Sequence, residues 1–260
     1  MAFCAPGSRP VRPTTDMRYA GALGILLGVV CCSASAFAYR PFDSTDADVA
    51  KAGELEFEIG PIGYLRENDD RFLVAPAIIA NVGIFDRLEL VLEGRNYIRT
   101  ASVPGEPRDE LADTALSLKG LLREGSMQDA SGLSVATEVG ALLPTTEPET
   151  GVGASAALIV SQRYEFAAAH LNGGVFLSRS HHPGAFVGLI VEGPFAWPVR
   201  PVIEGVFERE LDVGTVGTGL VGFIWRVRDN LSFDGAVRAG RAFDMALVEV
   251  RAGLTWAFEL

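Results

Sequence analysis

The chain has 260 residues, a formal net charge of −11 and 48% hydrophobic residues. This acidic balance argues against nucleic acid and against anionic membrane surfaces as partners, because both attract basic proteins. After residue 38, no stretch reaches the roughly 18 uninterrupted apolar residues of a membrane-spanning helix. The sequence therefore excludes a helical membrane protein.

The first 38 residues have the pattern of an export signal. Three basic residues, Arg9, Arg12 and Arg18, precede an apolar run over residues 20–30. Ala36-Phe37-Ala38 then fits the small-x-small rule for signal peptidase, which predicts cleavage before Tyr39. We expect residues 1–38 to be an N-terminal extension and signal peptide that is removed, and the mature protein to be exported.

Two details concern the same removed segment. Met17 stands just before Arg18 and the apolar run, so translation could start at Met1 or at Met17. All three cysteines, Cys4, Cys31 and Cys32, lie before the cleavage site. The mature chain then has no thiol and needs no disulfide. We expect residues 39–52 to form a periplasmic segment and residues 53–260 to form one β-barrel in the outer membrane.

The mature chain alternates with a period of two. In the last segment Val248, Val250, Ala252, Leu254, Trp256, Phe258 and Leu260 share one face, and Glu249, Arg251, Thr255 and Glu259 share the other. A membrane barrel places its apolar face toward lipid and its polar face toward the lumen. Segments of about ten residues are long enough for a tilted strand to cross the membrane.

Twelve such segments predict an all-β fold, a closed antiparallel up-and-down transmembrane barrel. They cover residues 53–65, 71–83, 87–98, 112–123, 132–143, 153–163, 166–177, 184–192, 198–209, 215–227, 230–240 and 247–260. An even number returns both ends to the periplasmic side. We expect short periplasmic turns at 85–86, 164–165 and 229–230 and longer extracellular loops at 100–111, 144–152 and 178–183, although 124–131 and 193–197 are long for periplasmic turns.

Aromatic residues support membrane insertion. The chain ends on Trp256, Phe258 and Leu260, which resembles the signal read by the barrel-insertion machinery and makes that machinery an expected partner. Aromatic side chains near strand ends could form the girdles at the two lipid–water interfaces; these are Tyr64, Tyr97, Trp197, Trp225, Trp256 and Phe258. Packing in the core of a soluble β-protein is the alternative for them.

Several motifs in order along the mature chain resemble one family. They are Arg40-Pro41-Phe42, Thr45-Asp46-Ala47-Asp48, Gly53-Glu54-Leu55-Glu56-Phe57-Glu58, Asp113, Lys119-Gly120, Leu143-Pro144-Thr145, His170-Leu171-Asn172-Gly173-Gly174, Glu204 and Gly253-Leu254-Thr255-Trp256. Together they resemble the MetA-pathway of phenol degradation family, whose members are outer-membrane transporter-like proteins. Thr146 departs from the family, which often has Gly there. The resemblance implies an outer-membrane barrel and uptake of small organic molecules.

Charged residues on the inward faces are the candidate functional residues. They are Glu56, Glu58, Glu89, Glu93, Arg95, Lys119, Glu138, His170, Asn172, Arg200, Glu204, Glu208, Arg226, Asp234, Arg238, Glu249 and Arg251, with Glu54, Gln162 and Glu192 on the same faces. They could line a polar pathway or form a salt-bridged filling, because a buried charge must be paired or hydrated. A third option is a blocked lumen with a side exit where Gly60-Pro61, Pro76 and Pro201 interrupt strand pairing.

Catalysis has little support. The histidines are His170, His181 and His182, and no metal-binding or hydrolase motif surrounds them. We expect no catalytic, cofactor or metal site. The first hypothesis is a passive outer-membrane channel or transporter for small molecules, with hydrophobic or aromatic ones among the candidates. The alternatives are a non-conducting structural barrel and a lipid-modifying hydrolase that uses one of the histidines.

Overall fold

The computed structural model describes residues 40–101, 107–146 and 151–260. The expected signal peptide, its cleavage site, the start at Met1 or Met17 and the three cysteines all lie outside the described residues. Within the described part of the chain, no helix is long and apolar enough to cross a membrane.

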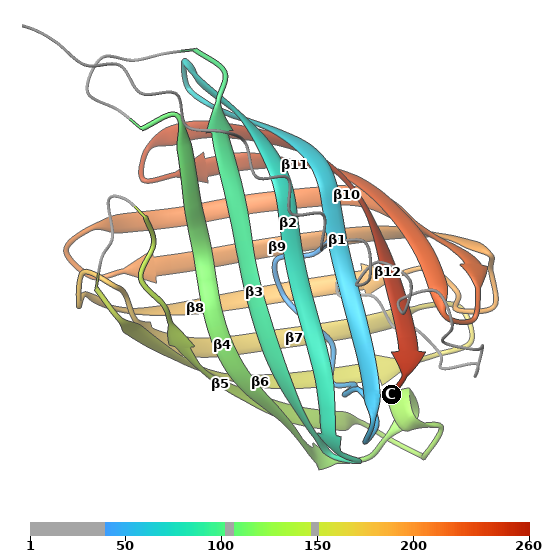
Figure 1. Ribbon diagram of the computed structural model, residues 1–260. Coiled ribbons are helices and arrows are strands. Elements are labelled where there is room, and N and C mark those ends of the chain that lie inside the picture. Colours follow the sequence, from blue (N-terminus) through green and yellow to red (C-terminus); the bar gives the residue numbers. More distant parts are fainter. Residues whose placement is uncertain (1–39, 102–106, 147–150) are drawn as a thin grey trace, which may run out of the picture. The chain divides into compact units, whose positions relative to one another are not determined.

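Twelve antiparallel strands close into one barrel (Figure 1). They are β1 (Glu54–Glu67), β2 (Asp70–Phe85), β3 (Leu88–Arg99), β4 (Asp109–Arg123), β5 (Ser134–Leu142), β6 (Gly153–Arg163), β7 (Ala168–Leu177), β8 (Pro183–Glu192), β9 (Val199–Glu210), β10 (Gly214–Arg228), β11 (Leu231–Ala242) and β12 (Met245–Glu259). Each strand pairs with its neighbours in sequence, and β1 pairs with β12. The predicted fold class, a closed up-and-down barrel of twelve strands, is confirmed.

The strand bounds follow the alternation of the sequence closely. The prediction for β6, residues 153–163, coincides with the observed strand, and β2 and β10 extend a little beyond theirs. Closure joins the two ends of the barrel chain, because Glu54 lies opposite Glu259 and Leu55 opposite Phe258. This pairing leaves no open edge, and an open edge could not be hydrogen-bonded in lipid.

The named connections lie on the rims that we expected, and the separation by length is imperfect, as the sequence already indicated. The rim that carries Glu54 and Glu259, here called the terminal rim, has the tight turn Asp86–Arg87 but also the connection Glu124–Leu133, which holds the 3₁₀-helix η1 (Ser126–Gln128). The opposite rim, here called the far rim, has tight turns as well, at Asn68–Asp69 and Phe243–Asp244. The short turns expected near 85–86, 164–165 and 229–230 therefore lie on the terminal rim, and the longer loops expected at 100–111, 144–152 and 178–183 lie on the far rim.

Two of the three proline positions lie at irregularities of the wall. The register of β1 against β12 shifts between Ile59 and Ile62, around Gly60-Pro61, and that of β2 against β3 shifts between Val74 and Ala77, around Pro76. Pro201 instead pairs in regular register with Phe223. Beyond these shifts the inward face of β1 changes parity, from Glu54, Glu56 and Glu58 to Leu65.

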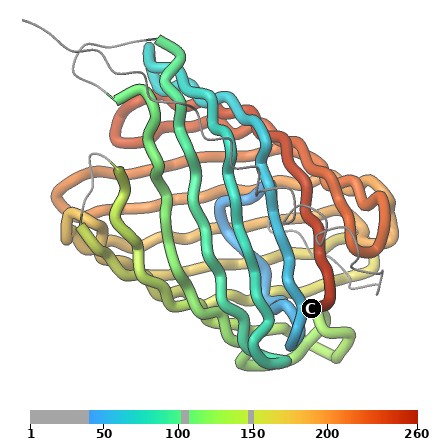
Figure 2. Tube along the Cα trace, viewed as in Figure 1, coloured from blue at the N-terminus to red at the C-terminus, as the bar shows by residue number. Residues whose placement is uncertain are grey.

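Residues 40–52 differ from the expectation of a periplasmic segment ahead of the barrel. Figure 2 shows this stretch in blue between the front and back walls. Its hydrogen bonds go to side chains that project inward from β1, β3, β6, β7 and β9. We call residues 40–52 the inner segment. Because it has no strand periodicity of its own, the sequence alternation could not place it.

Candidate functional site in the barrel lumen

The outer surface of the barrel is apolar. Side chains such as Leu158, Leu171, Val187, Ile203 and Val237 each expose close to half of their surface or more. They come from β6, β7, β8, β9 and β11, so the apolar face continues from strand to strand around the wall. A water-soluble protein rarely exposes apolar patches of more than a few hundred Å², whereas this arrangement suits contact with lipid.

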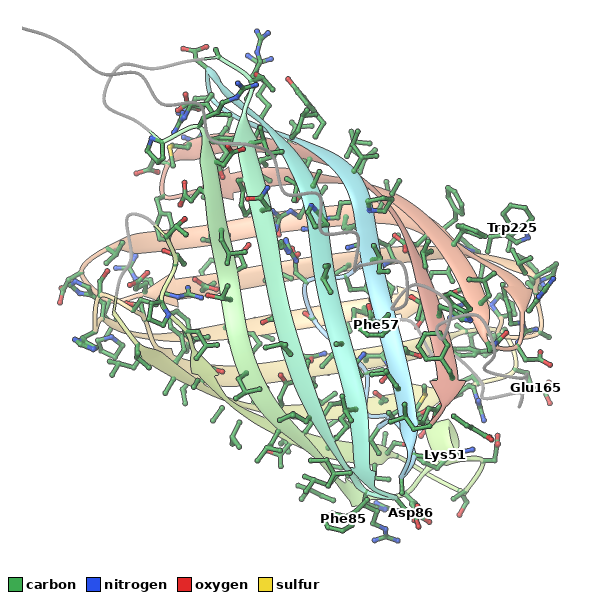
Figure 3. The ribbon with its side chains drawn as sticks, in the orientation of Figure 1. Lys51, Phe57, Phe85, Asp86, Glu165 and Trp225 are labelled. Carbon is green, nitrogen blue, oxygen red and sulfur yellow. The ribbon has the colours of Figure 1, made fainter. Side chains whose placement is uncertain are left out.

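Aromatic side chains gather near the terminal rim. Trp256 packs edge-on against Phe258 at 4.8 Å between ring centroids, Phe258 packs against Phe57 at 5.9 Å, and Trp225 lies 6.1 Å from Phe233. Figure 3 places Phe57, Phe85 and Trp225 toward this end of the barrel. Outward-facing aromatics at one level are typical of an interfacial girdle.

Tyr97 does not belong to such a girdle. Its hydroxyl donates a 2.6 Å hydrogen bond to Asp113, and its ring packs edge-on against Phe72 beside the buried residues Leu65 and Val74. Tyr97 follows the inward-facing Glu93 and Arg95 by four and two residues, so the alternation of β3 places it on the inward face. Tyr64, Trp197, Trp225 and Trp256 are exposed, and Phe258 is half-buried.

The structure places most of the sequence-derived candidates on the inner wall. Buried inside the barrel are Glu54, Glu56, Glu58, Glu89, Lys119, His170, Asn172, Glu192, Arg200, Glu204, Asp234, Glu249 and Arg251. Glu93, Arg95 and Glu138 line a cavity, Arg238 contacts the inner segment, and Glu208 is half-buried. Arg226 is exposed at the end of β10. Gln162 was assigned to the wrong face, since the adjoining Ser161 is the buried residue.

Carboxylates of the wall hold the backbone of the inner segment. Glu204 accepts hydrogen bonds from the N–H groups of Asp43 (2.9 Å) and Ser44 (2.7 Å). Glu58 accepts one from the N–H of Arg40 (2.8 Å), and Glu89 one from that of Ala50 (2.6 Å). Three inward acidic side chains therefore serve as anchors of the inner segment rather than as free lining.

Asp43 of the inner segment meets a group of arginines from three strands. Its carboxylate lies 2.6 Å from Arg251 Nη2, 2.5 Å from Arg238 Nη1 and 3.8 Å from Arg95 Nη2. We call these three residues the arginine clamp. Burial alone would raise the pKa of Asp43, but the positive charges of Arg251, Arg238 and Arg95 hold that pKa well below its usual range.

The neighbouring Asp48 behaves in the opposite way. Burial and the nearby carboxylate of Asp46 raise the pKa of Asp48 to about 6. Its Oδ1 accepts a 3.0 Å hydrogen bond from the side-chain amide of Gln128, which also donates to the carbonyl of Ala47. The 3₁₀-helix in the connection at the terminal rim thus contributes to holding the inner segment.

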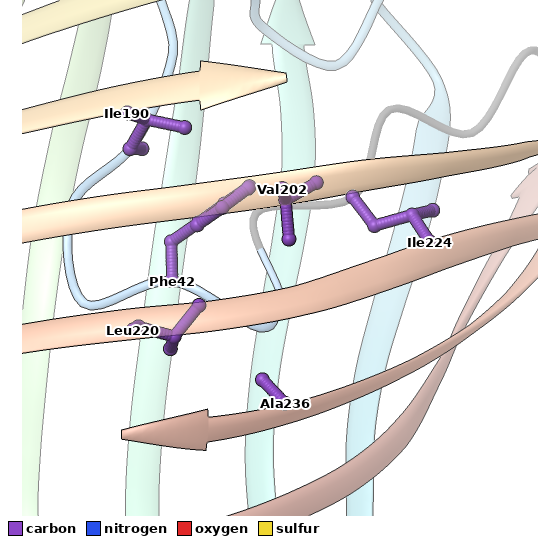
Figure 4. Packing of buried hydrophobic residues seen from close by; sticks show 6 residues of the cluster. All are labelled: Phe42, Ile190, Val202, Leu220, Ile224 and Ala236. Carbon is purple, nitrogen blue, oxygen red and sulfur yellow. The ribbon is translucent and has the colours of Figure 1, made fainter. Parts of the chain in front are cut away.

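Phe42 gives the inner segment an apolar anchor. Its ring is 7% exposed and packs in a buried cluster formed by inward residues of β8 to β11, namely Ile190, Val202, Leu220, Ile224 and Ala236 (Figure 4). Such apolar residues on the inner wall would face water in an empty lumen. Packing against Phe42 removes that apolar surface from water, which favours the docked segment.

The inner wall also comes unusually close to the inner segment. A Cβ on Gly83 would collide with the backbone carbonyl of Lys51, and a Cβ on Gly188 would collide with the side chain of Ser44. Glycine at these positions therefore makes room for the passing chain. The two residues lie on β2 and β8, on different parts of the wall.

A buried polar chain includes His170. Its Nδ1 lies 2.9 Å from Ser161 Oγ and its Nε2 lies 3.1 Å from Glu192 Oε1, while Arg200 Nε donates to Glu192 Oε2 at 2.6 Å. The serine, histidine and glutamate resemble the composition of a hydrolase triad. However, Ser161 is fully buried, and its Oγ accepts a hydrogen bond from the N–H of Ala47. This network of buried polar side chains thus holds the inner segment through Ser161.

The other two histidines lie apart from this chain. His181 and His182 belong to the connection between β7 and β8 on the far rim, where the N–H of His182 donates to Ser178 Oγ at 3.1 Å. Among the described residues, neither imidazole has a hydrogen-bond partner of catalytic type, and no cluster of side chains could hold a metal ion.

A cavity of about 180 Å³ lies in the lumen beside the inner segment. It is lined by Phe42, Asp43, Ser44 and Thr45 of the inner segment and by residues of β2 to β8. The lining mixes the rings of Phe42 and Phe186 with the charges of Glu93, Arg95 and Glu138. A cavity of about 150 Å³ can hold one benzene, so this one has room for a molecule of single-ring size.

Comparison with known proteins finds similar folds among solved structures. No protein-family model matches the chain, and no curated protein matches it. Among solved structures, the NanC porin aligns at 5% identity with a TM-score of 0.56, over 78% of this chain and 98% of its own. The COG4313 outer membrane channel from Pseudomonas putida F1 aligns at 10% identity with a TM-score of 0.55, over 84% and 100%.

A third similar structure is the KdgM porin in complex with disordered oligogalacturonate, at 10% identity and a TM-score of 0.54, over 79% of this chain and 99% of its own. This chain shares their β-barrel fold. At such low identity the likeness concerns the backbone, and the side chains of the lumen have to be interpreted on their own.

Sequence reasoning missed the residues that fill the lumen. Its candidates did not include Arg40, Phe42 and Asp43 of the inner segment, which contact the wall, or Ser161 of the wall, which contacts the inner segment. One signal was present. Ile190, Val202, Leu220 and Ile224 are apolar residues on strand faces that a water-filled lumen would make polar, and they therefore required an apolar partner inside.

Proposed function

We propose that this protein is an outer-membrane β-barrel that acts as a passive channel for small molecules, with residues 40–52 closing its lumen in the state described here. The observation that supports insertion most directly is the apolar outer face that runs from strand to strand around a closed barrel with a charged interior. In the membrane the terminal rim would face the periplasm, because both ends of a barrel with an even number of strands lie on that side.

The channel part of the proposal rests on how the lumen is filled. The inner segment is not a strand of the wall, and it is held by side-chain contacts from several strands. Such side-chain contacts can be broken while the backbone hydrogen bonds between the strands of the barrel stay intact. The resemblance to the MetA-pathway of phenol degradation family adds small hydrophobic or aromatic compounds as candidate solutes, and the cavity of about 180 Å³ agrees with that size.

A non-conducting structural barrel is the second candidate, and one observation favours it. Phe42, Asp43 and Ala47 each have a specific partner on the wall, as expected of a permanent filling. The two candidates differ in whether the inner segment leaves the lumen.

Two measurements test the proposal. The purified outer-membrane fraction should contain the protein in a form that migrates differently on a gel before and after boiling, as folded membrane barrels do. Reconstituted in planar bilayers, it should show conductance steps. Recovery of the folded protein from the periplasm without detergent would overturn the membrane assignment, and silent bilayers under all conditions would support the structural barrel instead.

A further inference from the structure

We infer that the arginine clamp, Arg95, Arg238 and Arg251, is a carboxylate-binding site of the lumen, and that Asp43 of the inner segment occupies it as a substitute for the carboxylate of a solute. The geometry is that of a recognised carboxylate: one oxygen lies 2.6 Å from Arg251 Nη2 and the other lies 2.5 Å from Arg238 Nη1. Guanidinium groups are suited to carboxylates because they offer several donors in one plane.

The wall keeps a surplus of positive charge at the clamp. Glu249 lies 2.8 Å from Arg238 and 2.9 Å from Arg251, and Asp113 approaches Arg95 at 3.9 Å. Three guanidinium groups therefore face two wall carboxylates, and the third carboxylate comes from the inner segment. Without Asp43 the clamp would need another anion, because an unpaired charge in a partly desolvated site is costly.

The clamp also has donors to spare. The Nε atoms of Arg238 and Arg251 are buried and have no hydrogen-bond partner among the described residues. Both side chains are mostly enclosed, with 15% and 5% of their surface exposed. Since Asp43 uses only Nη atoms of these two residues, a small carboxylate with a different approach could make further hydrogen bonds.

The lumen cavity adjoins this site at Arg95. Asp43 and Arg95 both line the cavity of about 180 Å³, and the rings of Phe42 and Phe186 line it beside them. Glu93 and Glu138 lie in the same lining and make no hydrogen bond or ion pair within the described chain. They would repel a solute of high negative charge, so the ligand class that fits is a monocarboxylate with a small apolar body.

Occupation of the clamp by a solute and by Asp43 is mutually exclusive. A monocarboxylate that binds the clamp therefore favours the undocked inner segment, whereas the same anion stabilises a barrel in which Asp43 is absent. Release of the segment as the opening step rests on the proposed channel function, but the binding site does not. The two effects have opposite signs for one ligand, which gives a test independent of conductance.

The experiment uses sodium acetate as the probe, compared with sodium chloride at equal ionic strength and pH, on the full mature chain in detergent. In the Asp43→Ala variant, acetate should raise the apparent melting temperature by roughly 3 °C once it exceeds its dissociation constant about tenfold. In a Ser44→Cys protein that keeps Asp43, acetate should accelerate modification of the thiol by a bulky maleimide several-fold.

Three controls make the result specific. Asp48→Ala removes a carboxylate from the same segment that contacts an amide instead of the clamp, and acetate should not change its melting temperature. Adding Arg238→Gln to Asp43→Ala should abolish the effect of acetate. If Asp43→Ala does not fold, Asp43→Asn, which keeps the shape, takes its place. Equal effects of acetate and chloride on both proteins would overturn the inference, whatever the bilayer conductance shows.

Discussion

Replacing Phe42 by alanine should release the inner segment from the lumen. The ring is 7% exposed and packs against five apolar residues of four strands. Burial of such a ring typically contributes about 3–5 kcal/mol, measured as the cost of Phe→Ala in a core. With about 3 kcal/mol taken for the docking equilibrium, the ratio of docked to undocked segments should fall about 100-fold, since 1.4 kcal/mol corresponds to a factor of ten.

The assay measures undocking of the inner segment and not the ion current through the barrel. A Ser44→Cys reporter is modified by a bulky maleimide at a rate that is proportional to the undocked fraction when docking is fast. Phe42→Ala should therefore raise the modification rate about 100-fold, and it should increase the open time in planar bilayers as well.

Phe223→Ala is the matched control, because it removes the same ring from the outer face of β10, where the side chain is 45% exposed. It should leave the modification rate unchanged. If Phe42→Ala and Phe223→Ala gave the same rate as the parent reporter protein, the apolar cluster would not hold the inner segment and our reasoning about the lumen would be refuted.

Four further outcomes can be checked with the same reporter or with a gel. Glu204→Gln keeps the shape but loses the charge that holds two backbone N–H groups, so undocking should rise about 5- to 30-fold, and an unchanged rate would contradict the anchor. Gly83→Ala, which forces the backbone of Lys51 to move, should also raise the rate, whereas Gly173→Ala, where a Cβ meets nothing within 4 Å, should not. Since the pKa of Asp48 is raised to about 6 in the docked segment, its neutral form is favoured there, so docking should weaken as the pH rises from about 4 through 6; Asp48→Asn should remove this dependence, with thiol reactivity corrected by a free cysteine peptide. Val237→Lys, on the lipid-facing side of β11, should lower the free energy of unfolding by up to about 2–4 kcal/mol in bilayers, and no change in the folded fraction on a gel would argue against lipid contact at that position.

The sequence predicted the wall far better than its contents. Alternation of side chains is a local property, so the bounds of β6 and the outward face of β12 could be found from residues that are neighbours in the chain. Tyr97 was assigned wrongly because only its place near a strand end was considered, whereas regular alternation along β3 puts it on the inward face with Glu93 and Arg95.

The inner segment could not be predicted because its partners are distant in sequence. Asp43 meets Arg238 and Arg251, which follow it by 195 and 208 residues, and no periodicity links them. The candidate list contained both arginines, but it treated the charged wall as a closed set. The missing carboxylate and the missing apolar partner of Ile190 and Leu220 both come from one short stretch that has no regular structure.

The central claim is that residues 40–52 close a membrane channel from inside. It is tested most directly by single-channel recording of the mature chain and of a variant that lacks residues 40–50, in the same bilayers. We expect the full chain to be mostly closed and the shortened chain to show frequent, larger conductance steps. Equal conductance of two properly folded barrels would contradict the account.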